Sequence, residues 1–301
     1  MNSIFQDIKQ SFREGSYLTK LIYINLAIFV IVRLADVVSV LFLSTTINPN
    51  RNIDSPLFWL MMPAQFSVFF SKFWTIITYM FLHFEFLHLL FNVLFLYWFG
   101  RVFLNFFNEK QLVGVYLLGG IAGGILYLLM FNLLPYYQNS VAGAAMLGAS
   151  ASALAIAVAS ATAAPHYKIR MLFIGEVRLQ YLALAYVLLS LLSITGSNQG
   201  GHIAHLGGAL AGYLFVKAWE NGKDFTQFFT TIINFFINLF RKKPNIKVSF
   251  ENKRFTTEQD YRDRKAAENQ MIDEILDKIK RSGYDSLSKE EKKALFDKSQ
   301  K

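Results

Sequence analysis

The sequence predicts an all-α membrane protein in which six transmembrane helices form a bundle, followed by a short helical cytoplasmic tail. Of the 301 residues, 53% are apolar and only 17% are charged, whereas soluble domains have about 25% charged residues. The sequence has six apolar runs of about the 20 residues that a membrane helix needs. Residues 1–220 hold only 12 of the 30 Lys and Arg and 8 of the 21 Asp and Glu. We therefore do not expect a single soluble fold.

The six apolar runs define a predicted membrane domain over residues 21–220. They cover residues 21–43, 73–99, 112–134, 142–163, 179–195 and 203–218. The polar stretch before them, residues 1–20, is too long and too acidic for the start of a signal peptide, and no small-residue cleavage site follows the first run. We expect an uncleaved first helix, an N-terminal cytoplasmic segment over 1–20 and a tail over 221–301.

Lys and Arg in the short loops give the orientation, because cytoplasmic loops carry an excess of these residues. With the N-terminus inside, the outer segments hold only Arg51 and Lys72. The inner segments hold Lys9, Arg13, Lys20, Arg101, Lys110, Lys168, Arg170 and Arg178. This pattern predicts an integral, multi-pass cell membrane protein with both termini in the cytoplasm.

The net charge of +9 could suggest a nucleic-acid partner. The excess is spread over a membrane-type core and a tail of mixed sign, so basic cytoplasmic flanks next to membrane lipids explain it better. We expect no nucleic-acid partner. The absence of Cys excludes disulfides, thiol nucleophiles and Cys-type zinc sites, and we expect no cofactor and no bound metal.

Two features of the membrane domain have structural interpretations. The outer loop over 44–72 is apolar around 58–63, which suits a segment in the membrane interface with Trp59 at headgroup level; an ordinary folded loop is the alternative. Arg33 and Asp36 lie within the first run at i, i+3. They share a helix face, so we expect a structural ion pair.

The tail shows local helix signals and no catalytic motif. Residues 225–240 have one apolar and one polar side and precede Arg241–Lys243, which predicts an amphipathic helix on the inner membrane surface; a buried half-helix is the alternative. Gly283 is a helix stop, and Ser288 with Glu291 fits a capping box. A narrow apolar stripe comes before them: Ile272, Ile275, Leu276 and Ile279. The tail's partner stays unknown.

Three clusters of polar residues lie inside the apolar runs, where such residues are expensive and therefore functional candidates. The clusters are His83, His88 and Asn92 in the second run, Gly148, Ser150 and Ser152 in the fourth, and His202, His205, Gly208 and Gly212 in the sixth. Taken alone, each has an ordinary interpretation: small residues allow close packing, and a membrane His often serves only as a hydrogen-bonding group.

Helical geometry relates these clusters to one another. His88 and Asn92 share a face, whereas His83 points elsewhere. His88 would lie about 22 Å along the second run, and Ser150 about eight residues into the fourth. If the early part of the fourth run is a loop rather than a helix, these groups and His205 share the outer half of the membrane. His205 shares its face with small residues that let the fourth helix approach closely. We expect Ser152 to face away from Ser150.

A Ser beside a His favours nucleophilic catalysis, because the imidazole removes the hydroxyl proton as the oxygen attacks a carbonyl. The backbone N–H groups of a Gly-x-Ser turn, with the side chains of His88 and Asn92, can stabilise the oxyanion. No Asp lies in the second to sixth runs, so Ser150 and His205 would form a dyad rather than a triad.

Together these residues resemble the rhomboid intramembrane serine proteases. Three motifs carry the resemblance: His83-x4-His88-x3-Asn92, Gly148-Ala149-Ser150, and His205-x2-Gly208-x3-Gly212. The run Thr78-Tyr-Met-Phe-Leu-His83 is also similar to the segment that leads into the first motif. The resemblance covers about residues 18–220, with the motifs in order and in the expected helices. The tail looks similar to short C-terminal extensions of some bacterial rhomboids.

The resemblance implies a six-helix bundle that cleaves other membrane-spanning proteins, with no cofactor. It assigns Ser150 as the nucleophile and His205 as the base. His88 and Asn92, with the Ser150 N–H, would form the oxyanion hole, and His83 would have a structural or supporting role. From the topology we expect cleavage near the outer face, at a site with small side chains followed by a helix-weakening Gly or Pro, with the loop over 44–72 and movement of the fifth helix as candidate gates.

Three positions depart from the usual rhomboid pattern. Ala151 stands where a second Gly is common, and Asn105 where a Glu is frequent. Leu154 occupies a position that is often aromatic, where the ring would pack on the catalytic His, so His205 could be oriented differently here.

Two other functions stay open. One is a catalytically silent relative that binds membrane proteins, against which the retained Ser150 and His205 argue. The other is a transporter that uses imidazoles as metal ligands: His83, His88, His202 and His205. Only Glu85 accompanies them as an intramembrane carboxylate, and no internal repeat of the transporter kind is evident.

Overall fold

The structure is a computed structural model that describes residues 4–49, 54–171, 175–231 and 258–299. The chain forms two units, Met1–Arg241 and Lys242–Lys301, and each is described by itself. Most of the described residues are helical, in agreement with the prediction.

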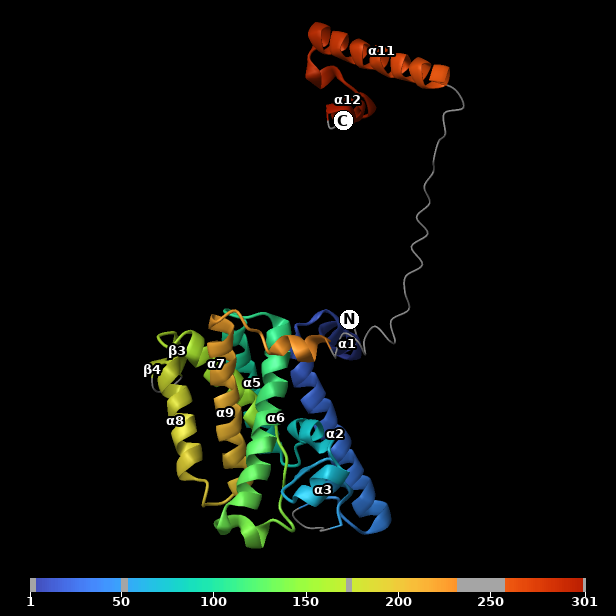
Figure 1. Ribbon diagram of the computed structural model, residues 1–301. Helices are drawn as coiled ribbons and strands as arrows, with labels where there is room; N and C mark the ends of the chain where they lie inside the picture. The colour runs from blue at the N-terminus through green and yellow to red at the C-terminus, as the bar shows by residue number, and fades with distance from the viewer. Residues whose placement is uncertain (1–3, 50–53, 172–174, 232–257, 300–301) are drawn as a thin grey trace. The chain divides into compact units, whose positions relative to one another are not determined.

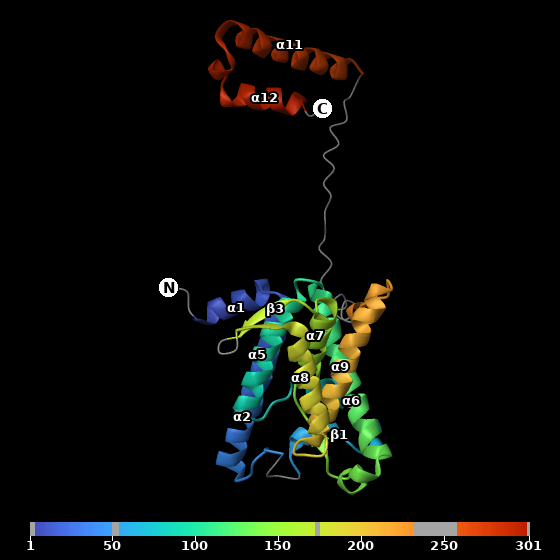
Figure 2. The same cartoon turned by 90° about the vertical axis from the view of Figure 1, so that its left-hand side faces the viewer.

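The first unit is a helical bundle (Figures 1 and 2). Its longer helices are α1 (Ile4–Glu14), α2 (Tyr17–Leu43), α5 (Phe86–Phe103), α6 (Glu109–Leu133), α7 (Ser150–Ala163), α8 (Leu179–Leu192) and α9 (Gln199–Glu220). By length and composition, α2, α5 and α6 can each cross a membrane, whereas α7 and α8 are apolar but shorter. Three candidate spans are thus present among the described residues, and the count of six stays a prediction.

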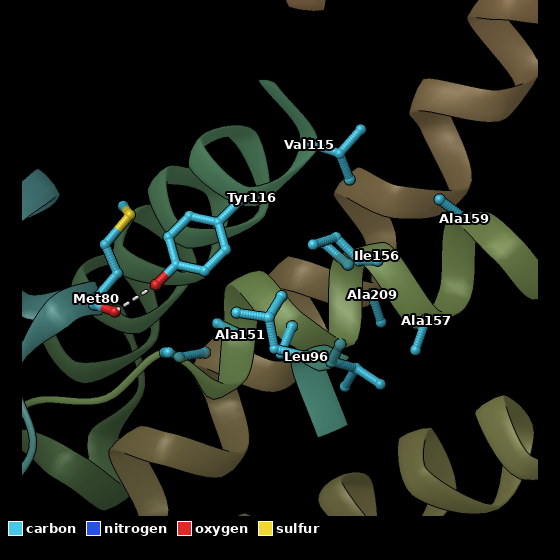
Figure 3. Packing of buried hydrophobic residues seen from close by; sticks show 14 of the residues in the cluster. Met80, Leu96, Val115, Tyr116, Ala151, Ile156, Ala157, Ala159 and Ala209 are labelled. Atoms are coloured by element: carbon cyan, nitrogen blue, oxygen red, sulfur yellow. Dashed lines mark hydrogen bonds between the residues drawn. The ribbon is translucent and has the colours of Figure 1, made fainter. Parts of the chain in front are cut away.

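Helix α7 forms the centre of the core because its small side chains let neighbouring helices approach its backbone. Residues 151–157 are all buried. A Cβ added to Gly208 or Gly212 of α9 would overlap the carbonyl oxygen of Ala151 or Ala155. Figure 3 shows the Ala side chains of α7 among larger residues of the cluster. The expected contact of the fourth and sixth runs is therefore present.

The second apolar run is not one helix, which corrects the prediction. It contains α4 (Thr75–Thr78) and η2 (Tyr79–Phe81), and α5 begins only at Phe86. Long-range hydrogen bonds to this segment compete with helix formation. The Tyr79 carbonyl oxygen accepts from the Gly148 N–H at 2.9 Å, and the Met80 carbonyl oxygen accepts from the Tyr116 hydroxyl at 2.8 Å (Figure 3). His83 therefore lies in a loop.

Two antiparallel ribbons depart from the all-α prediction. Strand β1 (Met62–Pro63) pairs with β2 (Ala145–Met146), and β3 (Lys168–Met171) pairs with β4 (Gly175–Arg178). The first ribbon ties the loop over 44–72 to the segment that leads into α7. It therefore fixes the path of the chain just before Ser150.

The loop over 44–72 contains short helices, which are η1 (Pro56–Trp59) and α3 (Phe66–Ser71). Trp59 and Phe70 are exposed, and Lys72 Nζ lies 4.3 Å from the centroid of the Trp59 ring. Another short helix of this unit is η3 (Pro135–Ser140). A position in the membrane interface stays a prediction.

The predicted ion pair in the first helix is present. Arg33 Nη1 lies 3.3 Å from Asp36 Oδ2. The other oxygen of Asp36 accepts from the Thr46 hydroxyl at 2.6 Å and from the Ile47 N–H at 3.0 Å. Asp36 therefore connects Arg33 in α2 to the start of the following loop, which is consistent with a structural role.

The second unit contains α11 (Glu258–Ser282), η4 (Tyr284–Ser286) and α12 (Lys289–Ser299). Gly283 ends α11 with a φ of +79°. The Ser288 N–H donates to Glu291 at 2.6 Å, and the Glu291 N–H donates to the Ser288 hydroxyl at 3.2 Å. The predicted helix stop and capping box are both confirmed.

The amphipathic helix predicted over 225–240 is described only in part. Residues 226–231 are helical. The remainder, with the basic residues 241–243, lies outside the described residues, as does Arg51.

Candidate active site

The N-terminal parts of three helices meet at the candidate site. His88 is the third residue of α5, Ser150 is the first residue of α7, and His205 is the seventh residue of α9. The three helices run in the same direction (Figure 2), so their N-terminal ends share one half of the bundle. This corrects the expected depth of His88, because α5 begins later than the second apolar run. The early part of the fourth run is not helical, as the alternative for Ser150 required, and α7 begins at Ser150 itself.

Ser150 and His205 are hydrogen bonded across the contact between α7 and α9. Ser150 Oγ lies 2.7 Å from His205 Nε2. The imidazole is 7% exposed and Ser150 is half-buried. The backbone contacts of Gly208 and Gly212 with α7 set the distance between the two helices, so the small residues of α9 bring the imidazole to the hydroxyl.

Gly148 places His88 and Asn92 beside the turn before Ser150. Its φ of +128° lies in the region that favours glycine. A Cβ at Gly148 would lie 2.9 Å from His88 Nε2 and 4.0 Å from Asn92 Nδ2. Because Gly148 has no side chain, the side chains of His88 and Asn92 from α5 can come close to the backbone that leads into α7.

His83 connects the loop before α5 to the start of α7. Its Nε2 lies 3.1 Å from Asn92 Nδ2 and 3.4 Å from the Ala149 N–H. A backbone N–H can only donate, so His83 Nε2 acts as an acceptor in this arrangement. The ring of His88 lies 5.1 Å from that of His83. His83 thus supports Asn92 and the start of α7 rather than contacting Ser150.

Two residues of α8 that the sequence analysis did not single out contact His205. Ser190 Oγ lies 3.1 Å from His205 Nδ1, and the Tyr186 ring centroid lies 5.3 Å from that of His205. Leu179 and Ala183 are also buried, so the four residues follow helical spacing on the inward face of α8. That spacing is the signal by which a polar Ser190 on an apolar face could have been found.

The other polar residues lie apart from the Ser150–His205 pair. Ser152 is fully buried, and its Oγ lies 3.8 Å from the sulfur of Met80. It points away from Ser150, as expected. His202 is the fourth residue of α9, and its ring lies 5.7 Å from that of His205. Among the described residues, no three His, Asp or Glu side chains gather as metal ligands would.

Two known protein families match parts of the chain. The sequence pattern of the Rhomboid domain matches residues 71–219, a span that contains the polar side chains of the site and the helices that carry them. A family of unknown function, DUF6576, matches residues 255–301. No curated protein that was compared with the chain matches it. With the Rhomboid match over the helices that carry Ser150 and His205, the chain belongs to the rhomboid family.

Proposed function

We propose that this protein is an intramembrane serine endopeptidase that hydrolyses peptide bonds in or near the transmembrane segments of other membrane proteins. The observation that carries the proposal is the distance of 2.7 Å between Ser150 Oγ and His205 Nε2. A nucleophile within hydrogen-bond reach of a base is the arrangement that hydroxyl catalysis needs.

In the first step, Ser150 Oγ attacks the carbonyl carbon of the scissile bond while its proton passes to His205 Nε2. The tetrahedral intermediate collapses as His205 gives this proton to the leaving amine, which leaves an ester on Ser150. A water molecule then attacks the ester, with its proton taken by the same nitrogen. Return of the proton to Ser150 Oγ releases the carboxylic acid product.

The N-terminus of α7 supports the oxyanion that forms in each step. Ser150 is the first residue of this helix, so its N–H has no acceptor within the helix and lies at the positive end of the helix dipole. The side chains of His88 and Asn92, next to Gly148, can add donors. Such donors favour the transition state because negative charge on oxygen develops only there.

The substrate is a membrane-spanning segment, so its scissile bond has to leave helical structure and meet water before attack. We propose that both termini are cytoplasmic and that cleavage takes place near the outer face. The favoured sites have small side chains followed by Gly or Pro, which weaken a helix. The loop over 44–72 and α8 are the proposed gates, and the tail has no proposed catalytic role.

A serine-reactive fluorophosphonate tests the nucleophile directly. We expect covalent labelling of the wild type and of Ser152→Ala, and no labelling of Ser150→Ala. Co-expression with tagged single-span proteins then tests the reaction: an outer fragment should appear with the wild type and not with Ser150→Ala. A folded protein that is neither labelled nor releases fragments would instead be a silent relative that binds membrane proteins.

A further inference from the structure

We propose that Ser190, assisted by Tyr186, is a positioning residue that holds the imidazole of His205 in the tautomer and orientation required for hydrolysis. The inference rests on the proposed function and adds a third residue to the dyad. Its starting point is that both ring nitrogens of His205 are hydrogen bonded to hydroxyl groups: Nε2 to Ser150 and Nδ1 to Ser190.

The hydrogen bond from His205 Nδ1 to Ser190 supports the tautomer that catalysis needs. A base that accepts the Ser150 proton at Nε2 must carry its own proton at Nδ1. That Nδ1–H needs an acceptor, because His205 and Ser190 are only 7% and 2% exposed and a buried polar group without a partner is costly. Ser190 Oγ, 3.1 Å away, is that acceptor. The opposite tautomer would place a proton between Nε2 and Ser150 and prevent proton transfer.

Ser190 also contributes after the proton has moved. The imidazolium that forms during attack donates from both nitrogens, and a hydrogen bond from a charged donor is stronger than one from a neutral donor. The serine hydroxyl is a weaker acceptor than a carboxylate, but it faces Nδ1 in a buried site where hydrogen bonds are strengthened. Ser190 thus acts at the position that an acidic residue occupies in a triad.

Tyr186 restricts the plane of the same ring. Its ring meets that of His205 at an interplanar angle of 63°, an edge-to-face arrangement that aromatic pairs prefer. Tyr186 is itself in contact with Phe95 of α5, with ring centroids 5.2 Å apart. On α7, the buried Leu154 offers no ring. Helix α8 therefore supplies the aromatic contact to His205 and, one turn later, the hydroxyl.

The rate of fluorophosphonate labelling tests the proposal without requiring a substrate. We expect Ser190→Ala to lower the labelling rate constant by about 10- to 100-fold, the effect of losing a hydrogen bond to a charged group. Loss of the acceptor destabilises the imidazolium more than the neutral ring, so the acid limb of the pH–rate profile should move to lower pH. Ser190→Thr keeps the hydroxyl and should recover most of the rate.

Ser160→Ala is the matched control. Ser160 is also buried, and its hydroxyl donates to the Ile156 carbonyl oxygen at 2.8 Å within α7. This variant loses one buried hydroxyl without touching His205, so its labelling rate and acid limb should equal those of the wild type. Tyr186→Leu, which removes the ring, should lower the labelling rate, and the conservative variant Tyr186→Phe, which keeps the ring, should recover most of it.

The outcomes separate this inference from the proposed function. Wild-type protein that is not labelled overturns the proposed function. Labelled wild type with an unchanged rate and acid limb in Ser190→Ala overturns the role of Ser190. Nitrogen-15 spectra of histidine-labelled protein, with His205 assigned through His205→Asn, decide the tautomer independently of activity. We expect the proton at Nδ1 in the wild type and a changed Nδ1 signal in Ser190→Ala; a proton at Nε2 in the wild type would contradict the proposal.

Discussion

The two units of the chain hold their polar groups in opposite ways. In Met1–Arg241, hydrogen-bonded residues such as Asp36, Asn92, Ser190 and His205 are buried. In the described part of Lys242–Lys301, Ile275 and Leu287 are buried, whereas the ion pairs, among them Lys278 with Glu291, are at the surface. A buried hydrogen bond is costly to remove and an exposed one is not.

The difference also concerns distance along the chain. The contacts of the candidate site join residues as far apart as Ser150 and His205, and the closest helix contacts are between backbones. The second unit relies on a cap between Ser288 and Glu291, three residues apart. Substitutions should therefore have large effects on stability and activity in the first unit and small ones in the second.

The largest effect is expected from Gly208→Ala. A Cβ at this position overlaps the Ala151 carbonyl oxygen, and α9 has to move away from α7. Alanine normally stabilises a helix by about 0.5–1 kcal/mol relative to glycine. We expect the opposite here: Gly208→Ala should lower the melting temperature. We expect labelling of Ser150 to be lost, because the distance from Ser150 to His205 depends on this contact.

Gly143→Ala is the control for Gly208→Ala, since no atom lies within 4 Å of a Cβ built on Gly143. Its melting temperature and labelling should match the wild type. Gly208→Ala with wild-type values of both would show that backbone contact between α7 and α9 does not position the site.

Asn92→Ala should reduce the rate of peptide cleavage by about 10²–10³, the usual effect of removing one oxyanion donor. Asn92 Nδ2 lies 3.1 Å from His83 Nε2 and 4.0 Å from a Cβ built on Gly148. Measurement of kcat and KM on one substrate separates the two roles: loss of transition-state stabilisation lowers kcat and leaves KM nearly unchanged. A change confined to KM would assign Asn92 to substrate binding instead.

The sequence predicts features that depend on short spacing. The Ser288–Glu291 cap, the Arg33–Asp36 pair and the small residues after His205 are each set within a few residues of the chain, and the structure has all three. Ser150 and His205 were expected to meet because their helices carry almost no bulky side chains at the contact. The catalytic role of this pair stays a proposal.

Features that depend on tertiary contacts could not be predicted in this way. The late start of α5 depends on bonds from Tyr116 and Gly148 to residues that hydropathy alone places in a helix. In the sequence, Ser190 looks like any other hydroxyl residue in an apolar run. Its contact with His205 becomes evident only from the packing of α8 against α9. Glycines of α6 that contact α7 or α9, such as Gly119 and Gly123, were also not singled out, because no reactive group accompanies them.

Asp36→Ala should destabilise the first unit without affecting chemistry. It leaves the buried N–H of Ile47 without its acceptor, at a cost of about 1–3 kcal/mol. Arg33→Ala should have a smaller effect, because the Arg33 side chain is 42% exposed and exposed ion pairs contribute about 1 kcal/mol or less. Thermal unfolding in detergent checks the order, and equal melting temperatures for the two variants would contradict it. Labelling of Ser150 should persist in both below their melting temperatures.

The smallest effect is expected at Glu291 in the second unit. The hydrogen bond from Lys278, assisted by the Ser288 N–H, holds the pKa of the Glu291 carboxyl below its ordinary value. The folded state therefore binds this proton less tightly than the unfolded state. The contribution of Glu291 to stability is present above the ordinary pKa of Glu, about 4.3, and is lost as the pH falls through the lower folded value.

Carbon-13 NMR of the Glu carboxyl groups in the full chain measures this pKa. Lys278→Gln should return the Glu291 midpoint toward the ordinary value, because it removes the largest cause of the shift. The wild-type shift should also shrink in high salt, since the Lys278–Glu291 pair is at the surface and its attraction is screened. A salt-independent midpoint would assign the shift to the cap with Ser288 alone, and the contrast between buried and exposed polar groups would then not extend to this contact.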